Sequence, residues 1–234
     1  IRKNKSSNAS SYFKFSKSIS YSISCRFLKI IFASSSEVYG NPEEHEIPIT
    51  EDNPIRPANP YSISKVGHDL MSQYYHNAYG LKIITTRMFT HTGPRRGDVF
   101  AESTFAKQIA MIEAGQIPPV LKVGNLDSLR TWADVRDAVR AYYFLVTVNP
   151  IAGQSYNIGG TYSCTIRQML DYLLSLSSRK DIRVEVDPQR LRPIDADLQV
   201  PDVSKFHNHT GWEPQISFER TMGDLLNYWR ERIA

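Results

Sequence analysis

The sequence predicts an α/β fold, because strand-like and helix-like segments alternate along most of its 234 residues. Two observations support this prediction. Residues 28–33 form an apolar run that is typical of a buried strand. Pro60 is a residue that starts helices, and Gly80 is one that ends them, so a helix is expected between them and a second strand at 81–89.

The alternation continues to the end of the chain. Residues 100–114 are expected to form a helix closed by Gly115, and residues 134–148 a helix with Thr131 as its start signal. Trp229 lies on the apolar side of an expected final helix at 217–233. The remaining expected elements are short strands at 155–158 and 182–186 and a helix at 165–177.

Four side chains suited to proton transfer follow the first two expected elements. Ser35 and Glu37 come directly after strand 28–33, at the edge of a parallel sheet where open α/β folds bind ligands. Tyr61 and Lys65 are four residues apart and share one helix face. An ammonium beside a phenol lowers the pKa of the phenol, which can then act as a base near neutral pH. A Tyr–Lys pair at this spacing also occurs by chance on long helices, so the pair alone does not establish a site.

Composition and charge restrict the function classes. The net charge of +4 arises from residues 1–30, which hold seven basic residues and no acidic one. The rest has 21 basic and 24 acidic residues, so no basic face for nucleic acid is expected. Cys25 and Cys164 are too few for a disulfide framework or a zinc site, which favours a reducing compartment, and no apolar run is long enough to span a bilayer. We therefore expect a cytoplasmic protein with no metal site, nucleic-acid partner or membrane partner.

Three motifs, in this order and spacing, carry a family resemblance. They are Ser-Ser-Ser-Glu-Val-Tyr-Gly at 34–40, Pro-Tyr-x-x-x-Lys at 60–65 and Arg-Met-Phe-Thr-His-Thr-Gly-Pro-Arg-Arg-Gly at 87–97. The chain resembles the extended short-chain dehydrogenase/reductase family, in its nucleotide-sugar epimerase/dehydratase branch, and within it the GDP-mannose 4,6-dehydratases. The resemblance runs from about residue 30 to the C-terminus. It implies a partial Rossmann-like parallel sheet with a smaller C-terminal substrate domain.

The resemblance also implies a reaction, the loss of water from GDP-mannose to give GDP-4-keto-6-deoxymannose, which makes the protein a lyase. Transient oxidation at C4 by NADP makes the C5 proton acidic. Tyr61 would remove the O4 proton, Lys65 would support it and hold the nicotinamide ribose, and Ser35 would hydrogen-bond O4. Glu37 would take the C5 proton and assist loss of the C6 hydroxyl. Ser35 departs from the threonine that is usual in the dehydratases but keeps the hydroxyl.

Further contacts are implied residue by residue. His91 and Arg96 would contact the cofactor together with Tyr61 and Lys65. Thr90 stands where the dehydratases commonly have asparagine. The resemblance places substrate contacts at Thr90, Lys107, Arg130 and Arg192, of which Arg130 lies in a segment, 123–132, similar to the family's substrate loop.

One family feature is missing from the sequence. No G-x-x-G-x-x-G or G-x-G-x-x-G occurs, and no glycine precedes Gly40, although the family holds the cofactor pyrophosphate on a glycine-rich turn. We therefore expect residues 30–93 to be the C-terminal half of the NADP-binding domain and residues 94–234 to be mainly the sugar-nucleotide domain. Residues 1–29 form an atypical Ser/Lys-rich segment. For 6–27 we favour an aberrant insertion or an out-of-frame stretch, with a half-buried strand or a transit-peptide-like segment as alternatives.

Three functional interpretations remain open. The first is the dehydratase, which the Pro94–Gly97 loop favours because its arginines help to bind NADP in that enzyme. The second is a GDP-4-keto-6-deoxymannose reductase, which can also carry Glu37, or an epimerase of the same branch. The third is an inactive fragment that contacts a GDP-sugar but cannot hold cofactor. The resemblance implies a homo-oligomer, a dimer or tetramer, for the complete enzyme.

Overall fold

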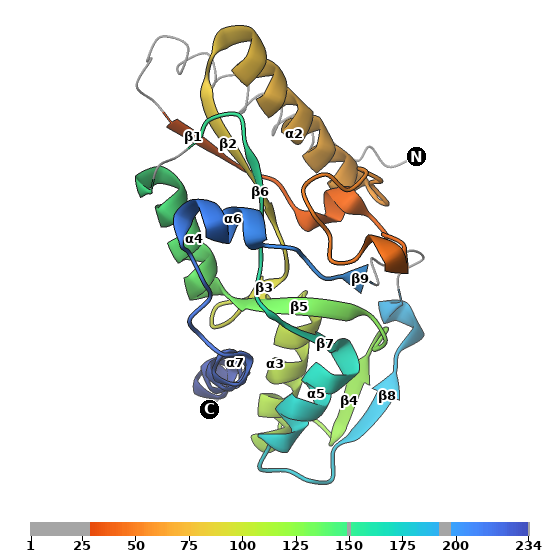
Figure 1. Cartoon of the computed structure of the whole chain (residues 1–234). Helices are drawn as coiled ribbons and strands as arrows, with labels where there is room; N and C mark the ends of the chain where they lie inside the picture. The colour runs from red at the N-terminus through yellow and green to blue at the C-terminus, as the bar shows by residue number, and fades with distance from the viewer. Residues whose placement is uncertain (1–28, 149–150, 192–197, 234) are drawn as a thin grey trace, which may run out of the picture.

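The computed structural model of the chain describes residues 29–148, 151–191 and 198–233 (Figure 1). Arg192, Cys25 and the Ser/Lys-rich segment up to residue 28 lie outside the described residues. The helices are α2 (Pro60–Tyr79), α3 (Ala101–Glu113), α4 (Val135–Thr147), α5 (Ile166–Ser175), α6 (Ser204–Thr210) and α7 (Phe218–Ile233). Three short 3-10 helices are η1 (Ser36–Tyr39), η2 (Glu44–Glu46) and η3 (Pro188–Arg190). The strands are β1 (Lys29–Ala33), β2 (Lys82–Met88), β3 (His91–Thr92), β4 (Val120–Val123), β5 (Leu129–Asp134), β6 (Ser155–Ile158), β7 (Tyr162–Thr165), β8 (Arg183–Val186) and β9 (Leu198–Gln199).

A parallel sheet of strand order β1-β2-β6 forms the upper part of the molecule in Figure 1. Successive side chains of β2 point to opposite faces. Thr86 lies 3.2 Å from the hydroxyl of Tyr142 on α4, whereas Arg87 lies 2.7 Å from Asp69 on α2. The two helices therefore cover opposite faces of the sheet, and β2 is buried between them.

Helix α2 has strong local signals at both ends. The side-chain oxygen of Asn59 accepts a hydrogen bond from the backbone N–H of Ser62, and the hydroxyl of Ser62 accepts one in return from the N–H of Asn59. This reciprocal cap satisfies two N–H groups that the first turn leaves without helical partners. Pro60 is the first helical residue, and Gly80 ends the helix in the left-handed conformation at φ 67°. The predicted helix is thus confirmed.

The lower part of the molecule contains the other two sheets and three helices (Figure 1). β5 pairs with β3 and β9 in parallel and with β7 in antiparallel orientation, while β4 pairs with β8. Helices α3, α5 and α7 enclose the largest apolar cluster, which includes Phe105, Leu121, Met169 and Leu225. Trp229 packs against this cluster from α7, as predicted.

The sequence predicted the fold class and most elements, with two corrections. An α/β fold with a parallel sheet is confirmed. The start signal assigned to Thr131 was wrong, because Thr131 lies within β5 and Asp134 caps α4 by accepting a hydrogen bond from the N–H of Arg136. The segment 123–132, expected as a loop, contains the first part of β5.

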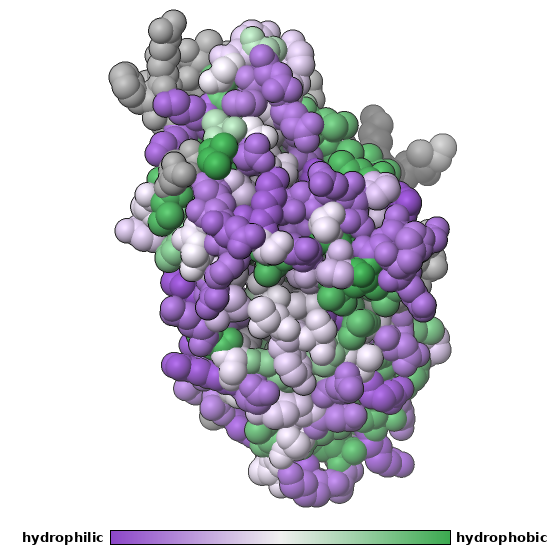
Figure 2. Space-filling model, viewed as in Figure 1, coloured by the Kyte–Doolittle hydropathy of each residue, from purple (hydrophilic) through white to green (hydrophobic). Residues whose placement is uncertain are grey.

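Three further observations concern the surface, the helices and the side chains that can bind metals. The face seen in Figure 2 is mostly hydrophilic, and its hydrophobic residues lie in small separate groups. No helix in the described parts of the chain is long and apolar enough to cross a bilayer. Across the same residues, no group of three His, Cys, Asp or Glu side chains is arranged to hold a metal ion.

Candidate active site

Ser35 and Glu37 lie at the carboxyl end of β1, as the sequence predicts. The N–H of Ser34 donates a hydrogen bond to the carbonyl oxygen of Thr86 at 2.8 Å. This bond extends the pairing of β1 with β2 one residue beyond the end of β1. Ser35 is extended and caps η1, because its Oγ accepts from the N–H of Glu37 at 3.2 Å. Gly40 ends the turn at φ 63°, and a Cβ there would lie 1.9 Å from the carbonyl oxygen of Arg56. The turn therefore requires glycine at position 40.

The carboxylate of Glu37 is joined to the start of helix α2. Its Oε2 accepts a hydrogen bond from Nδ2 of Asn59 at 2.9 Å. The other side-chain atom of the same amide, Oδ1, accepts from the N–H of Ser62 at 2.8 Å. One amide group thus caps the helix that carries Tyr61 and Lys65 and also holds the carboxylate.

Tyr61 and Lys65 share one face of α2, and the ammonium of Lys65 lies 5.6 Å from the centre of the Tyr61 ring. Lys65 Nζ donates to the carbonyl oxygen of Ala33, the last residue of β1, at 2.8 Å. Partial burial lowers the pKa of Lys65. The Tyr61 side chain is half exposed and is open to a ligand at this edge.

A buried polar network supports η1 from behind. Arg87 of β2 donates from Nε to Asp69 at 2.7 Å and from Nη1 to the hydroxyl of Tyr39 at 2.9 Å. Burial raises the pKa of Tyr39 to about 12, so that its hydroxyl keeps a proton and donates it to Asn157 at 2.7 Å. The network joins η1, α2, β2 and β6 behind Ser35 and Glu37.

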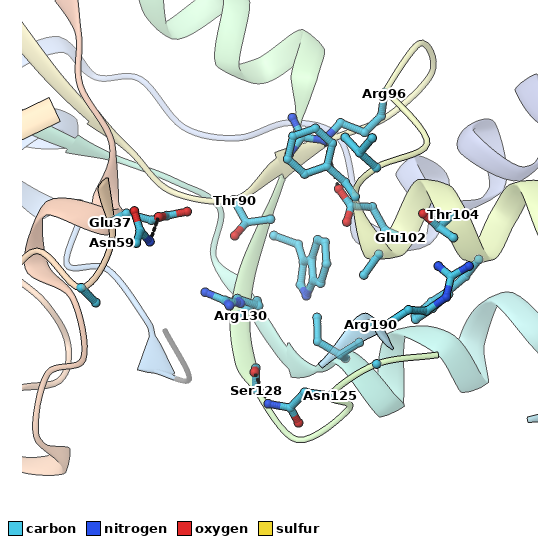
Figure 3. A pocket seen from close by; sticks show the side chains of 18 of the residues that line it. Glu37, Asn59, Thr90, Arg96, Glu102, Thr104, Asn125, Ser128, Arg130 and Arg190 are labelled. Atoms are coloured by element: carbon cyan, nitrogen blue, oxygen red, sulfur yellow. Dashed lines mark hydrogen bonds and ion pairs between the residues drawn. The ribbon is translucent and has the colours of Figure 1, made fainter. Parts of the chain in front are cut away.

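A pocket of about 410 Å³ opens in front of Glu37. Its volume is within the range of small-molecule sites. Figure 3 shows Glu37 and Asn59 at one end, Arg96, Glu102 and Thr104 at the other, and Thr90 and Arg130 between them. The lining also includes Phe100, Phe105, Asn125, Ser128, Trp132 and Arg190. The pocket combines aromatic walls with three guanidinium groups, which suits a ligand with a ring system and an anionic part.

The three arginines of the pocket are held differently. Arg130 lies inside β5, with Cys164 of β7 and Gln199 of β9 as its register partners, so strands fix its backbone on both sides. Arg96 donates from Nε to Glu102 at 3.2 Å, and its guanidinium lies 3.3 Å from the centre of the Phe100 ring. Arg190 pairs with Asp187 at 3.4 Å.

Other predicted site residues lie outside the pocket lining. His91 contacts the carbonyl of Phe89 through Nδ1 at 3.0 Å, and burial lowers its pKa. Lys107 pairs with Asp98 at 2.6 Å and lies over the Trp229 ring, 5.2 Å from its centre. Ser35, Tyr61 and Lys65 are at the edge of β1 but do not line the cavity.

Sequence reasoning missed Asn59, Glu102 and Arg190. Asn59 directly precedes the Pro-Tyr-x-x-x-Lys motif and is a preferred helix cap, so its place at the start of α2 was detectable. Its contact with Glu37, which is 22 residues away in the sequence, could not be predicted from the sequence. Glu102 and Arg190 reach the pocket through the packing of α3 and η3.

The edge of the sheet presents polar groups of the kind that bind a dinucleotide cofactor. Lys65 contacts the carbonyl of Ala33 there, and the Oγ of the next residue, Ser34, is buried without a hydrogen-bond partner among the described residues. A buried hydroxyl without a protein partner can be satisfied by a bound water or by a polar group of a ligand. No glycine-rich turn for a pyrophosphate occurs in the sequence.

Comparison with known proteins places these features in a family. The profile of the family described as GDP-mannose 4,6 dehydratase matches residues 17–225. GDP-6-deoxy-D-mannose reductase of Pseudomonas aeruginosa is 29% identical over 203 residues, which cover 87% of this chain and 66% of that protein. GDP-mannose 4,6-dehydratase of Yersinia enterocolitica is 29% identical over 220 residues, covering 83% of this chain and 58% of that protein.

A solved structure shows the same fold. The structure of RMD from Pseudomonas aeruginosa complexed with NADPH superposes with a TM-score of 0.80 at 28% identity and covers 86% of this chain and 66% of that one. The matched part therefore spans between 58% and 66% of the length of these three proteins.

Proposed function

Because the chain belongs to the GDP-mannose 4,6-dehydratase family, we propose that it carries the catalytic residues that convert GDP-mannose to GDP-4-keto-6-deoxymannose. The observation that supports this most directly is the carboxylate of Glu37 at the wall of the pocket, on the strand edge next to the Tyr61 helix. Elimination of water from C5 and C6 needs a base at C5, and a carboxylate held by one amide is suited to that task.

The proposed roles follow from the positions of the side chains. Tyr61 takes the proton from O4, and Lys65, whose ammonium lies 5.6 Å from the centre of the Tyr61 ring, supports it. Ser35 donates a hydrogen bond to O4 and keeps its proton. Glu37 removes the C5 proton and returns a proton to the C6 hydroxyl, which leaves as water. The net change is the loss of one water with no change in oxidation level.

NADP, when bound, supplies the reversible hydride acceptor that makes the C5 proton acidic. Tyr61 and Lys65 are proposed to hold its nicotinamide ribose, and His91 and Arg96 to contact it. The cofactor of the solved relative complexed with NADPH supports NADP. Arg96 also lines the pocket, so one guanidinium serves both ligands in this proposal.

The sugar nucleotide is proposed to occupy the 410 Å³ pocket. Arg130 is assigned to the diphosphate, because a guanidinium binds phosphate oxygens in pairs. Thr90 is assigned to the sugar. Lys107 and Arg192 remain candidates for contacts with the diphosphate. Lys107 would first have to break its ion pair with Asp98. Residues 30–93 are proposed as the C-terminal half of the cofactor domain and residues 94–234 as mainly the sugar-nucleotide domain, which contributes β6 to the first sheet.

The reductase is the second candidate function. The similarity to the reductase of Pseudomonas aeruginosa covers as much of the chain as any dehydratase match described above. The Pro94–Gly97 loop favours the dehydratase, whereas Glu37 is compatible with both enzymes. A chain that cannot hold cofactor by itself is the third candidate.

One experiment separates the three. The purified chain is incubated with GDP-mannose and NADP, and separately with GDP-4-keto-6-deoxymannose and NADPH, with product masses and NADPH absorbance followed. Loss of one water from GDP-mannose without net change in NADPH supports the dehydratase. Consumption of NADPH with the keto sugar supports the reductase. No turnover together with no calorimetric binding of NADP indicates an inactive fragment.

A further inference from the structure

Asn59 stands between the two halves of the candidate site, and both the oxygen and the nitrogen of its amide are hydrogen-bonded. The Oδ1 atom accepts from the N–H of Ser62 at 2.8 Å, and Nδ2 donates to Glu37 Oε2 at 2.9 Å. The opposite orientation of the amide would place NH₂ against an N–H and a carbonyl against a carboxylate. The network therefore admits a single orientation of this amide.

The carboxylate of Glu37 depends on this amide. Among the residues that the structure describes, Asn59 is the one hydrogen-bond partner of the Glu37 side chain. The bond uses one lone pair of Oε2, whereas Oε1 has no hydrogen bond among the described residues and is available to a ligand proton. Figure 3 shows the pair at one end of the pocket, joined across its wall.

The amide also links Glu37 to the position of Tyr61. Asn59 is the cap of α2, and Tyr61 is the second residue of that helix. A second contact, between Lys65 and the carbonyl of Ala33, joins the same helix to the end of β1. A rotation of α2 about the Lys65 contact would move Tyr61 and, through Asn59, the carboxylate together.

We infer that Asn59 is a positioning residue that fixes the Glu37 carboxylate relative to the helix carrying Tyr61. This inference rests on the proposed function for its catalytic meaning. The hydrogen bond holds one carboxylate rotamer, directs Oε1 to the proton and keeps the distance between base and phenol constant. A misplacement of about 1 Å at a reacting group can cost on the order of 100-fold in rate.

Two substitutions separate positioning from helix capping. In Asn59→Ser the hydroxyl retains the cap, since serine and asparagine are similarly good caps, but the donor to Glu37 is lost. In Asn59→Asp the cap is also retained, and a second carboxylate faces Glu37. We expect kcat to fall at least about tenfold in Asn59→Ser and further in Asn59→Asp, with smaller changes in KM. Asn59→Ala, which removes cap and donor together, is the structural control.

A merely structural role makes a different prediction. If Asn59 only caps α2, Asn59→Ser and Asn59→Asp will retain the thermal midpoint and kcat of the unsubstituted chain, and only Asn59→Ala will lose both. That result overturns the inference. A lower kcat at an unchanged thermal midpoint in Asn59→Ser supports it.

A reversed pair tests the contact without any turnover. In the double variant Asn59→Asp with Glu37→Gln, the donor and the acceptor are exchanged, so the hydrogen bond can re-form. Each single substitution shifts the urea midpoint of unfolding. We expect the midpoint of the double variant to be higher than the sum of these two shifts predicts. Additive effects overturn the inference. If the unsubstituted chain has no activity, the proposed function fails, and the same stability cycle still decides whether Asn59 holds Glu37.

Discussion

Lys65 Nζ donates a hydrogen bond to the carbonyl oxygen of Ala33 at 2.8 Å, and this contact joins helix α2 to the carboxyl end of β1. Its ammonium lies 5.6 Å from the centre of the Tyr61 ring. One lysine therefore both anchors the helix at the sheet edge and places a positive charge beside the phenol. Lys65→Met removes both contributions, whereas Lys65→Arg keeps the positive charge.

Lys65→Met retains most of the aliphatic stem and removes the charge. If the proposed function is right, kcat should fall by about 100-fold or more, because positioned acid–base groups contribute factors of this order. Steady-state product formation from GDP-mannose is the measurement. Lys82→Met, on an exposed lysine at the start of β2, is the control and should behave as the unsubstituted chain. A Lys65→Met variant with nearly unchanged kcat contradicts the assigned role.

The burial of Lys65 predicts a pH dependence. Burial lowers the pKa of Lys65, so its charge is lost at a lower pH than that of an exposed lysine, about 10.4. Activity that needs the ammonium should then decline as the pH rises through the lowered pKa. In Lys65→Arg the guanidinium stays charged, so any remaining activity should persist to higher pH. The test is the alkaline limb of the kcat profile, and an identical limb in both proteins would show that another group causes it.

Glu37→Gln tests the proton acceptor separately from binding. A glutamine carbonyl can still accept from Asn59, so the fold at η1 should persist, whereas the side chain can no longer take a proton. We expect kcat to fall about 100-fold or more and KM to change little. Incorporation of solvent deuterium at C5 of the sugar provides a direct readout. Exchange at the rate of the unsubstituted chain would assign the base elsewhere.

The Arg87–Asp69 pair behind the site is expected to be important for folding. Both side chains are almost completely buried, and their closest atoms are 2.7 Å apart. Arg87→Met leaves the carboxylate of Asp69 and the hydroxyl of Tyr39 without this donor, and we expect a loss of about 3–5 kcal/mol in the free energy of unfolding. Replacing both residues, as Arg87→Met with Asp69→Leu, removes the unpaired charge as well. Urea unfolding should show the double variant to be less destabilised than the sum of the single variants.

The elements with local signals could be predicted from the sequence. The signals for α2 are its cap, Pro60 and Gly80, all of which lie within the helix or next to it in the sequence. The signal for β2 is a continuous apolar run. The predicted family was confirmed by the match over residues 17–225. Helix α6 was missed, because its seven residues are largely polar and only Gly211, at φ 67°, marks an end.

The pocket could be predicted only in part, because its walls come from distant segments. Arg130 was predicted to contact substrate because it lies in a motif. The position of its backbone, however, is fixed by Cys164 and Gln199, which pair with it in the two neighbouring strands. The contact between Asn59 and Glu37 has no local pattern. Lys107 has the charge for a phosphate contact, but it forms an ion pair with Asp98. This pairing depends on how the turn before α3 places Asp98.

Glu113 should control stability in acid. Its carboxylate, at the end of α3, accepts from Arg230 of α7 at 2.7 and 2.8 Å and from Ser177 and Ser178 after α5 at 3.0 and 2.9 Å. The hydrogen bonds from Arg230, more than any other contact, lower the pKa of Glu113 to about 2. Because the folded pKa is below the unfolded value of about 4.3, this stabilisation is present above that pH and is lost as the pH falls toward 2.

Glu113→Gln should remove this acid-sensitive part of the stability. At neutral pH we expect a loss of about 1–2 kcal/mol, limited by solvent screening at the partly exposed Arg230. Near pH 2 most of the difference between the variant and the unsubstituted chain should have disappeared, because Glu113 is then about half protonated in the folded protein and almost fully protonated in the unfolded protein. Urea midpoints measured from pH 7 to pH 2 give the comparison, with Glu231→Gln on an exposed position of α7 as the control. A difference that stays constant down to pH 2 would show that Glu113 acts through packing instead of charge.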